Sequence, residues 1–229
     1  EYLQRLYPCK GIKINNDKFF TENYSSICLN EDFFGKGKKY VGKQSFTIVH
    51  TSNKSNTTIK GQDILIEAVG ILVSKGYDVN IEFIGDSEIK DYYFKIAEKC
   101  GIRDRISFTG LISSKNIIRD HLEKGDFYVL PTKMEGLPRS IIEAMAVGLP
   151  VISTPIAGIP ELIENKYLCK QDDFKKISET IEFFINNPII AEKESLRNIK
   201  IAYEYTDDKL QIKRDSFYKK LKLLTEKGL

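Results

Sequence analysis

The sequence predicts an α/β protein in which a parallel β-sheet is flanked by helices. Between residues 46 and 153, short apolar runs alternate with longer amphipathic segments, and several amphipathic segments are followed directly by glycine. Apolar runs of four to six residues are typical of buried parallel strands, whereas the longer segments suit the helices that connect them. The chain shows no internal repeat or low-complexity tract.

The individual elements follow from these runs. We expect strands at residues 46–50, 79–84, 105–109, 126–130 and 150–153. We expect helices at residues 64–75, 88–99, 114–123 and 138–147, the first two of which end at glycine. Residues 172–186 form a further helix that stops before Pro188, and two charged helices cover residues 190–205 and 207–224. Residues 1–45 are irregular apart from a short strand at 26–29.

Composition excludes several classes of protein. A length of 229 residues allows one substantial core, or one domain with appendages. The net charge of +3 gives no basic field for nucleic acid, and the longest apolar runs are shorter than the ~18 residues of a transmembrane segment. The four cysteines have no metal-binding spacing, which fits a reducing cytoplasmic location. Because the chain begins with Glu1, we expect it to be a fragment.

The segment from residue 126 to residue 146 carries the strongest chemical signal. It reads as strand, glycine loop and helix, which places the loop at the carboxyl edge of the sheet, where such folds bind ligands. Gly136 lets the backbone approach a ligand, and Pro138 suits the first helical position, whose free amides attract anions. Glu135 and Glu143 are placed to accept hydrogen bonds from hydroxyls at either end. The pattern indicates a sugar nucleotide; the alternative is a pair of glutamates that favour a helix start.

Four motifs in order resemble one family. They are E-x7-E at 135–143 within EGLPRSIIEAMAVGLPVISTPIAGIPELI, KGQDILIEA at 60–68, IEFIGD at 81–86 and RISFTG at 105–110. Together they resemble glycosyltransferase family 4, the group 1 glycosyl transferases, whose fold is GT-B. The resemblance is dense over residues 44–188.

This resemblance implies a domain organisation. Residues 44–188 would form the Rossmann-like nucleotide-sugar-binding domain, the C-terminal half of a GT-B enzyme. Residues 1–43 would be the remnant of an N-terminal domain and linker. Residues 189–229 would form C-terminal helices that cross back to the enzyme's own N-terminal GT-B domain, which is absent here, or pack on their own domain.

The resemblance also implies a reaction. A retaining glycosyltransferase moves a sugar from a nucleotide diphosphate sugar to the hydroxyl of an acceptor glycan or lipid-linked glycan, as in polysaccharide or glycoconjugate biosynthesis. The expected setting is the cytoplasm or the inner membrane face, and this fragment alone is expected to be inactive. No cofactor is expected, and no metal, because no D-x-D metal motif is found.

Site residues are carried over from the matching positions. Glu135 and Lys60 are the expected catalytic residues, facing the donor sugar and the leaving diphosphate respectively. Glu143 is expected to hold the ribose and the loop at Leu111 to lie near the base. The remaining expected donor-binding residues are Gly136, Leu137, Pro138, Ser52 and Arg139.

One position departs from the family pattern. Many members have Gly-Arg at the end of the first strand, with the arginine on the diphosphate, whereas this chain has His50 and Thr51. Ser52, Lys54 or Arg139 would have to compensate. His50 is expected to be a hydrogen-bonded strand-end residue, not a base. The departure keeps a non-catalytic nucleotide-sugar-binding module open as an alternative, and a nucleotide-sugar 2-epimerase of GT-B fold would use a similar cleft.

Overall fold

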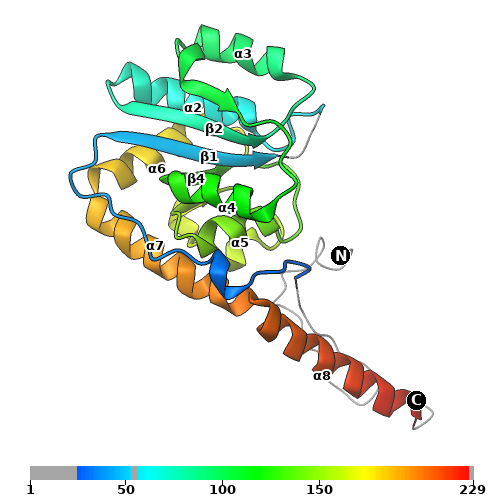
Figure 1. Cartoon of the computed structure of the whole chain (residues 1–229). Helices are drawn as coiled ribbons and strands as arrows, with labels where there is room; N and C mark the ends of the chain where they lie inside the picture. Colours follow the sequence, from blue (N-terminus) through cyan, green and yellow to red (C-terminus); the bar gives the residue numbers. More distant parts are fainter. Residues whose placement is uncertain (1–24, 53–55, 227–229) are drawn as a thin grey trace.

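The computed structural model describes residues 25–52 and 56–226. It contains a five-stranded parallel sheet with the strand order β3-β2-β1-β4-β5. The strands are β1 (Ser45–Ser52), β2 (Asp78–Gly85), β3 (Ile106–Phe108), β4 (Phe127–Leu130) and β5 (Val151–Ser153). The predicted parallel α/β fold is therefore confirmed (Figure 1).

Helices connect the strands and follow the sheet. They are α2 (Gln62–Ser74), α3 (Lys90–Lys99), α4 (Lys115–Lys124), α5 (Arg139–Ala146), α6 (Phe174–Asn186), α7 (Pro188–Ala202) and α8 (Asp207–Glu226). Short 3-10 turns lie at η1 (Glu31–Phe33), η2 (Arg103–Arg105), η3 (Ile159–Glu161), η4 (Asn165–Tyr167) and η5 (Tyr203–Tyr205). Every helix expected from the sequence is present, with ends that differ by a few residues.

Three local predictions were wrong. Residues 26–29 do not form a strand, because Leu29 makes only an isolated bridge with Thr206 and has no neighbouring strand to pair with. Helix α7 begins at Pro188 and not at residue 190 as expected, because proline is tolerated at the first helical position, which needs no backbone N–H. Pro138 is the N-cap of α5 and not its first helical residue.

The sheet forms the centre of the core, and helices cover both of its faces. Buried side chains of the strands, such as Ile48 and Val129, meet buried side chains of the helices, such as Leu65 and Ile142. Helix α2 packs against α3 and α6, while α5 packs against β4, β5 and α7. Helix α8 leaves this body and extends away from it, with only Leu210 buried among its residues (Figure 1).

The topology marks one edge of the sheet for ligand binding. The connections run outward from β1 to β3, and the chain then returns to β4 on the other side of β1. In open α/β sheets, the crevice at such a reversal, outside the carboxyl ends of the strands, is where ligands bind. Here the reversal lies between β1 and β4, so the loops that follow Ser52 and Leu130 meet there.

Close backbone contact shapes this edge. Gly85 ends β2 with φ +129°, and a Cβ atom there would lie 1.7 Å from the carbonyl oxygen of Ser52. Only glycine allows β1 and β2 to end side by side in this way.

Candidate functional site

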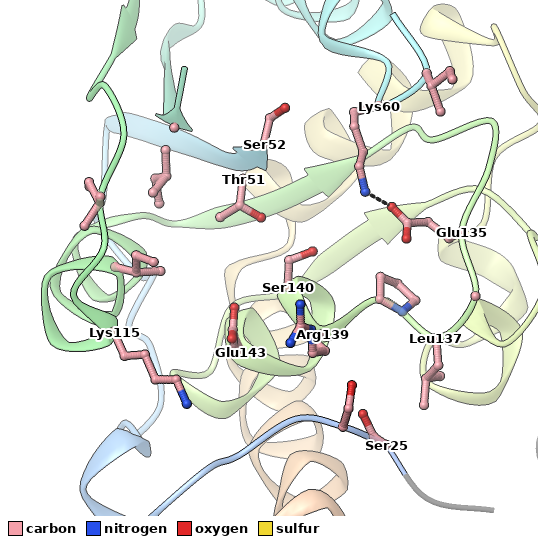
Figure 2. A pocket seen from close by; sticks show the side chains of 18 of the residues that line it. Ser25, Thr51, Ser52, Lys60, Lys115, Glu135, Leu137, Arg139, Ser140 and Glu143 are labelled. Carbon is pink, nitrogen blue, oxygen red and sulfur yellow. Dashed lines mark hydrogen bonds and ion pairs between the residues drawn. The ribbon is translucent and has the colours of Figure 1, made fainter. Parts of the chain in front are cut away.

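A cleft of about 730 Å³ opens at the reversal between β1 and β4. Every residue that the sequence assigned to catalysis or donor binding lines this cleft: Ser52, Lys60, Leu111, Glu135, Gly136, Leu137, Pro138, Arg139 and Glu143. The structure thus brings together helix α5 and the loops after β1, β3 and β4, which are far apart in the sequence (Figure 2).

The two glutamates lie on either side of the start of α5. Glu135 belongs to the loop after β4, and Glu143 lies on α5 itself (Figure 2). Burial raises the pKa of the Glu143 carboxyl, and the charges of Arg139 and Lys115 oppose this effect. A partly buried carboxylate beside open space is suited to accept hydrogen bonds from ligand hydroxyls.

The N-terminus of α5 faces the space between these acids. Pro138 is its N-cap and provides no side-chain cap, and the first turn contains no acidic residue. Within the described chain, the backbone N–H groups of Gly136 and Leu137 donate no hydrogen bond. These two amides precede the N-cap, and free amides next to the positive end of a helix dipole suit the binding of an anion.

A turn behind this loop fixes its position. The N–H of Gly158 donates to the carbonyl oxygen of Gly136 at 3.0 Å, and a Cβ atom on Gly158 would lie 2.9 Å from the Leu137 side chain. The turn at 158–162 therefore supports the wall of the cleft.

Lys60 reaches into the cleft from the loop after β1. The carbonyl oxygen of the preceding residue, Ile59, accepts hydrogen bonds from the Lys133 N–H at 2.8 Å and the Thr132 hydroxyl at 3.2 Å. These bonds attach the Lys60 loop to the loop that carries Glu135. The Lys60 ammonium and the Glu135 carboxylate form a direct ion pair (Figure 2).

The side chains at the end of β1 are polar, and they form hydrogen bonds with other residues of the domain. The Ser52 hydroxyl accepts a hydrogen bond from the Gln62 amide at 3.0 Å. The Thr51 hydroxyl lies 2.6 Å from the Tyr128 hydroxyl. Thr51, at the position where many members of the resembled family have arginine, thus carries no charge and contacts a buried tyrosine.

His50 is buried and does not line the cleft. Burial is the main cause that lowers its pKa to about 4; the hydrogen bond to Val129 opposes this effect, and the charge of Lys60 adds to it. The ring is therefore neutral near pH 7, and its Nδ1–H donates to the carbonyl oxygen of Val129 at 2.8 Å. This is the hydrogen-bonded strand-end role expected from the sequence.

Sequence reasoning missed several residues of the cleft. Lys115 begins α4, Ser140 lies in the first turn of α5, and Ser25 and Ser26 lie at the start of the described chain. Lys115 belongs to no motif, but its place after the strand–loop at 105–114 puts it at the same sheet edge. Lys54, which the sequence offered as a substitute for the missing arginine, lies outside the described residues.

Two kinds of feature are absent from the described residues. In residues 25–52 and 56–226, no group of three or more His, Cys, Asp or Glu side chains has a geometry that could hold a metal ion. Within the same residues, no helix is long and apolar enough to span a bilayer.

Comparison with known proteins places the chain in a family. The family model for "Glycosyl transferases group 1" matches residues 37–204, which is most of the chain. The chain belongs to the group 1 glycosyl transferases. The family expected from the four motifs is therefore confirmed.

Relatives of this group 1 glycosyl transferase share moderate identity with it. Protein CapJ of Staphylococcus aureus is 27% identical over 225 residues, which is 96% of this chain and 54% of the relative. The amylovoran biosynthesis glycosyltransferase AmsK of Erwinia amylovora is 35% identical over 115 residues, which is 48% of this chain and 28% of the relative. The chain spans at most about half the length of these relatives.

Solved structures agree with the fold of this group 1 chain. The C-terminal domain of the group 1 protein LpcC from Francisella tularensis has a TM-score of 0.66 and 21% identity, covering 78% of this chain and 99% of that one. HepE of Anabaena, crystallised with UDP and glucose, has a TM-score of 0.71 and 20% identity, covering 85% of this chain and 55% of that one. The sheet and helices are thus those of the C-terminal domain of GT-B glycosyltransferases.

Proposed function

We propose that this chain is the donor-binding half of a retaining glycosyltransferase and that a nucleotide diphosphate sugar occupies its cleft. The observation that carries the proposal is the arrangement of one cleft in which an uncapped helix N-terminus lies between two glutamates, with Lys60 opposite. Anionic phosphate at the helix start and hydroxyl-rich groups at both ends fit that arrangement.

Each residue then has a role at the donor. The amides of Gly136 and Leu137 bind the diphosphate at the start of α5, and Pro138 leaves this end of the helix without a side-chain cap. Glu135 holds hydroxyls of the donor sugar. Lys60 offsets the charge that develops on the diphosphate as its bond to the sugar breaks, an electrostatic contribution to the transition state.

The nucleoside end of the ligand would lie toward the other side of the cleft. Glu143 holds the ribose hydroxyls, and Leu111, in the loop after β3, lies near the base. Backbone recognition at this loop would leave the choice among uracil, guanine and adenine open.

Other cations replace the arginine that many family members carry after the first strand. Arg139 and Lys115 both line the cleft, at the first positions of α5 and α4. Their charges act on Glu143 and on any phosphate between the two helices. Ser52 is the remaining proposed donor-binding residue, and its hydroxyl accepts a hydrogen bond from the Gln62 side-chain amide at 3.0 Å.

Relatives suggest the biological setting. The names of several relatives refer to polysaccharides, among them the capsular polysaccharide biosynthesis glycosyltransferase CapM of Staphylococcus aureus, 32% identical over 147 residues. We propose the same class of pathway here, with an acceptor glycan or lipid-linked glycan, in the cytoplasm or at the inner membrane face. We also propose that the reaction needs no metal, since the sequence has no D-x-D motif.

A thermal-shift screen of the 229-residue chain against UDP-, GDP- and ADP-sugars tests donor binding. A ligand present at about 100 times its dissociation constant adds about 2.7 kcal/mol to the stability, which shifts the melting temperature measurably. A tenfold weaker affinity in Lys60→Ala should reduce this stabilisation to about half or less, whereas Glu179→Ala, on the exposed surface of α6, should keep the full shift. No shift with any sugar nucleotide would contradict the proposal.

Product analysis separates the reactions. Incubation of the chain alone with donor and acceptor should give no transfer, because the acceptor half is not present, and transfer by this chain would overturn that expectation. In the intact protein, formation of an epimer from donor alone would indicate a 2-epimerase. Donor binding without transfer would indicate a binding module.

A further inference from the structure

In the proposed binding mode, the ion pair between Lys60 and Glu135 lies where the diphosphate meets the donor sugar. It joins the loop after β1 to the loop after β4, across 75 residues of sequence (Figure 2). The Glu135 side chain is 12% exposed and that of Lys60 is 34% exposed, so the lysine faces the open cleft and the carboxylate lies deeper.

The backbones on both sides of this pair are fixed. The Lys60 loop is hydrogen-bonded through Ile59 to Lys133 and Thr132, in the same segment that leads to Glu135. The Thr132 hydroxyl also lies 3.2 Å from the carbonyl oxygen of Met134. Glu135 therefore stays near Lys60 when a ligand enters, and any phosphate that binds Lys60 meets a carboxylate beside it.

The two ligands of the proposed reaction differ in charge at this point. A free nucleoside diphosphate ends in a phosphate with a charge of about −1.5 to −2 at pH 7, because its second pKa is about 6. In the sugar ester that terminal oxygen is bonded to carbon, and the phosphate carries a single charge. A carboxylate within about 4–6 Å disfavours the more charged form.

We propose that Glu135 is a specificity-determining residue that makes this cleft bind the nucleotide diphosphate sugar in preference to the free nucleoside diphosphate. The inference rests on the proposed function. Sugar hydroxyls donate hydrogen bonds to the Glu135 carboxylate when the donor is bound, whereas the extra phosphate charge repels it once the sugar has left. The same residue thus favours substrate over product and speeds release of the diphosphate.

The test compares UDP with UDP-glucose, GDP with GDP-mannose and ADP with ADP-glucose by calorimetry at about pH 8, on the whole 229-residue chain. Glu135→Gln should bind the free diphosphate about tenfold more tightly than the unmodified chain, while its affinity for the sugar ester stays equal or falls. The matched control is Glu143→Gln, at the other side of the cleft, which should change both affinities by the same factor because both ligands have the ribose.

A pH series on the unmodified chain gives a second measurement that does not depend on the folding of a variant. Near pH 5 the terminal phosphate is protonated, so the preference for the sugar ester should shrink several-fold between about pH 8 and pH 5. Unchanged affinity of Glu135→Gln for the free diphosphate, or a preference that does not vary with pH, overturns the inference. If neither the free nucleoside diphosphates nor the nucleotide diphosphate sugars bound, the proposed function would be overturned instead.

Discussion

The Nδ1 nitrogen of His50 lies 2.8 Å from the carbonyl oxygen of Val129, so a side chain of β1 is hydrogen-bonded to the backbone of β4 inside the core. The other ring nitrogen, Nε2, is buried and has no hydrogen-bond partner within the described chain. A protonated ring would therefore place a charge with one unsatisfied donor in the core, and this explains why its pKa falls to about 4.

This burial makes the stability depend on pH. In the unfolded chain His50 takes up a proton below its ordinary pKa of 6.5, whereas in the folded chain it does so only at about 4. The contribution of His50 to the free energy of unfolding is therefore fully present above pH 6.5. It falls by about 3 kcal/mol as the pH falls from 6.5 toward 4, because protonation of the ring then favours the unfolded chain. Urea unfolding at several pH values between about 7.5 and 4 measures it.

Asparagine at position 50 provides the direct comparison. Its amide nitrogen can still donate to the Val129 carbonyl, but it does not titrate. His50→Asn should lower stability at about pH 7.5 and flatten the dependence between pH 6.5 and 4, whereas His121→Asn, at the second histidine of the chain, should leave the contribution of His50 in place. If the unfolding free energy changed equally with pH in the unmodified chain and in His50→Asn, His50 would not be the cause of the pH dependence.

Lys60 and Glu143 should each contribute to donor affinity. Lys60→Ala removes a charge-assisted hydrogen bond to phosphate, and Glu143→Ala removes acceptors for the ribose. We expect each change to weaken binding of the sugar nucleotide about tenfold or more, which corresponds to ~1.4 kcal/mol or above. Calorimetry with the best ligand of the screen measures both, and unchanged affinity in both variants would refute the roles proposed for them.

Much of this site could be predicted from the sequence, because its residues directly follow apolar runs that are recognisable as buried strands. The strand ending near Ser52 and the strand ending at Leu130 were recognisable from composition, and parallel strands bring their carboxyl ends to one edge. The motif residues at 60 and 135–143 were therefore expected at the same edge of the sheet. Their roles in binding a donor remain predictions.

Contacts that depend on register and packing could not be predicted. The Lys60–Glu135 ion pair joins two loops 75 residues apart, and no local pattern specifies it. Lys115 sits on a solvent-exposed helix start that looks like any charged surface position. The strand expected at 26–29 failed because an apolar run needs a partner strand, and Leu29 has only one bridge, to Thr206.

Gly61 should be essential for holding the Lys60 loop. Its φ is +76°, and a Cβ atom would lie 2.2 Å from the carbonyl oxygen of Pro131, so Gly61→Ala adds a clash to a left-handed conformation. We expect a loss of more than about 2 kcal/mol, since the conformation costs roughly 1–2 kcal/mol and overpacking about 1–3 kcal/mol. Urea unfolding measures the loss.

Gly76 is the matched control for this substitution. Its φ is +91°, but nothing lies within 4 Å of the position of a Cβ atom. Gly76→Ala should therefore lose only the conformational part, about 1 kcal/mol. If the two alanine variants were equally stable, the close approach of Gly61 to Pro131 would not be a constraint on the loop.

Asn198 should stabilise the attachment of α7 to the domain. Its side-chain amide donates to the carbonyl oxygen of Leu149 at 2.8 Å, and the residue is 1% exposed. Helix α7 also packs along α5, the helix that carries Glu143. Because Asn198→Ala leaves a buried carbonyl without its donor, we expect a loss of about 1–3 kcal/mol in unfolding free energy.

Leu196 offers the control on the same helix, since its side chain is 59% exposed. The free energy of unfolding of Leu196→Ala should stay within about 0.5 kcal/mol of that of the unmodified chain. A large difference between the two variants would mean that α7 is part of the Rossmann-like domain in solution. If Asn198→Ala proved as neutral as Leu196→Ala, α7 would contribute little to the domain, and the expected boundary at residue 188 would be favoured.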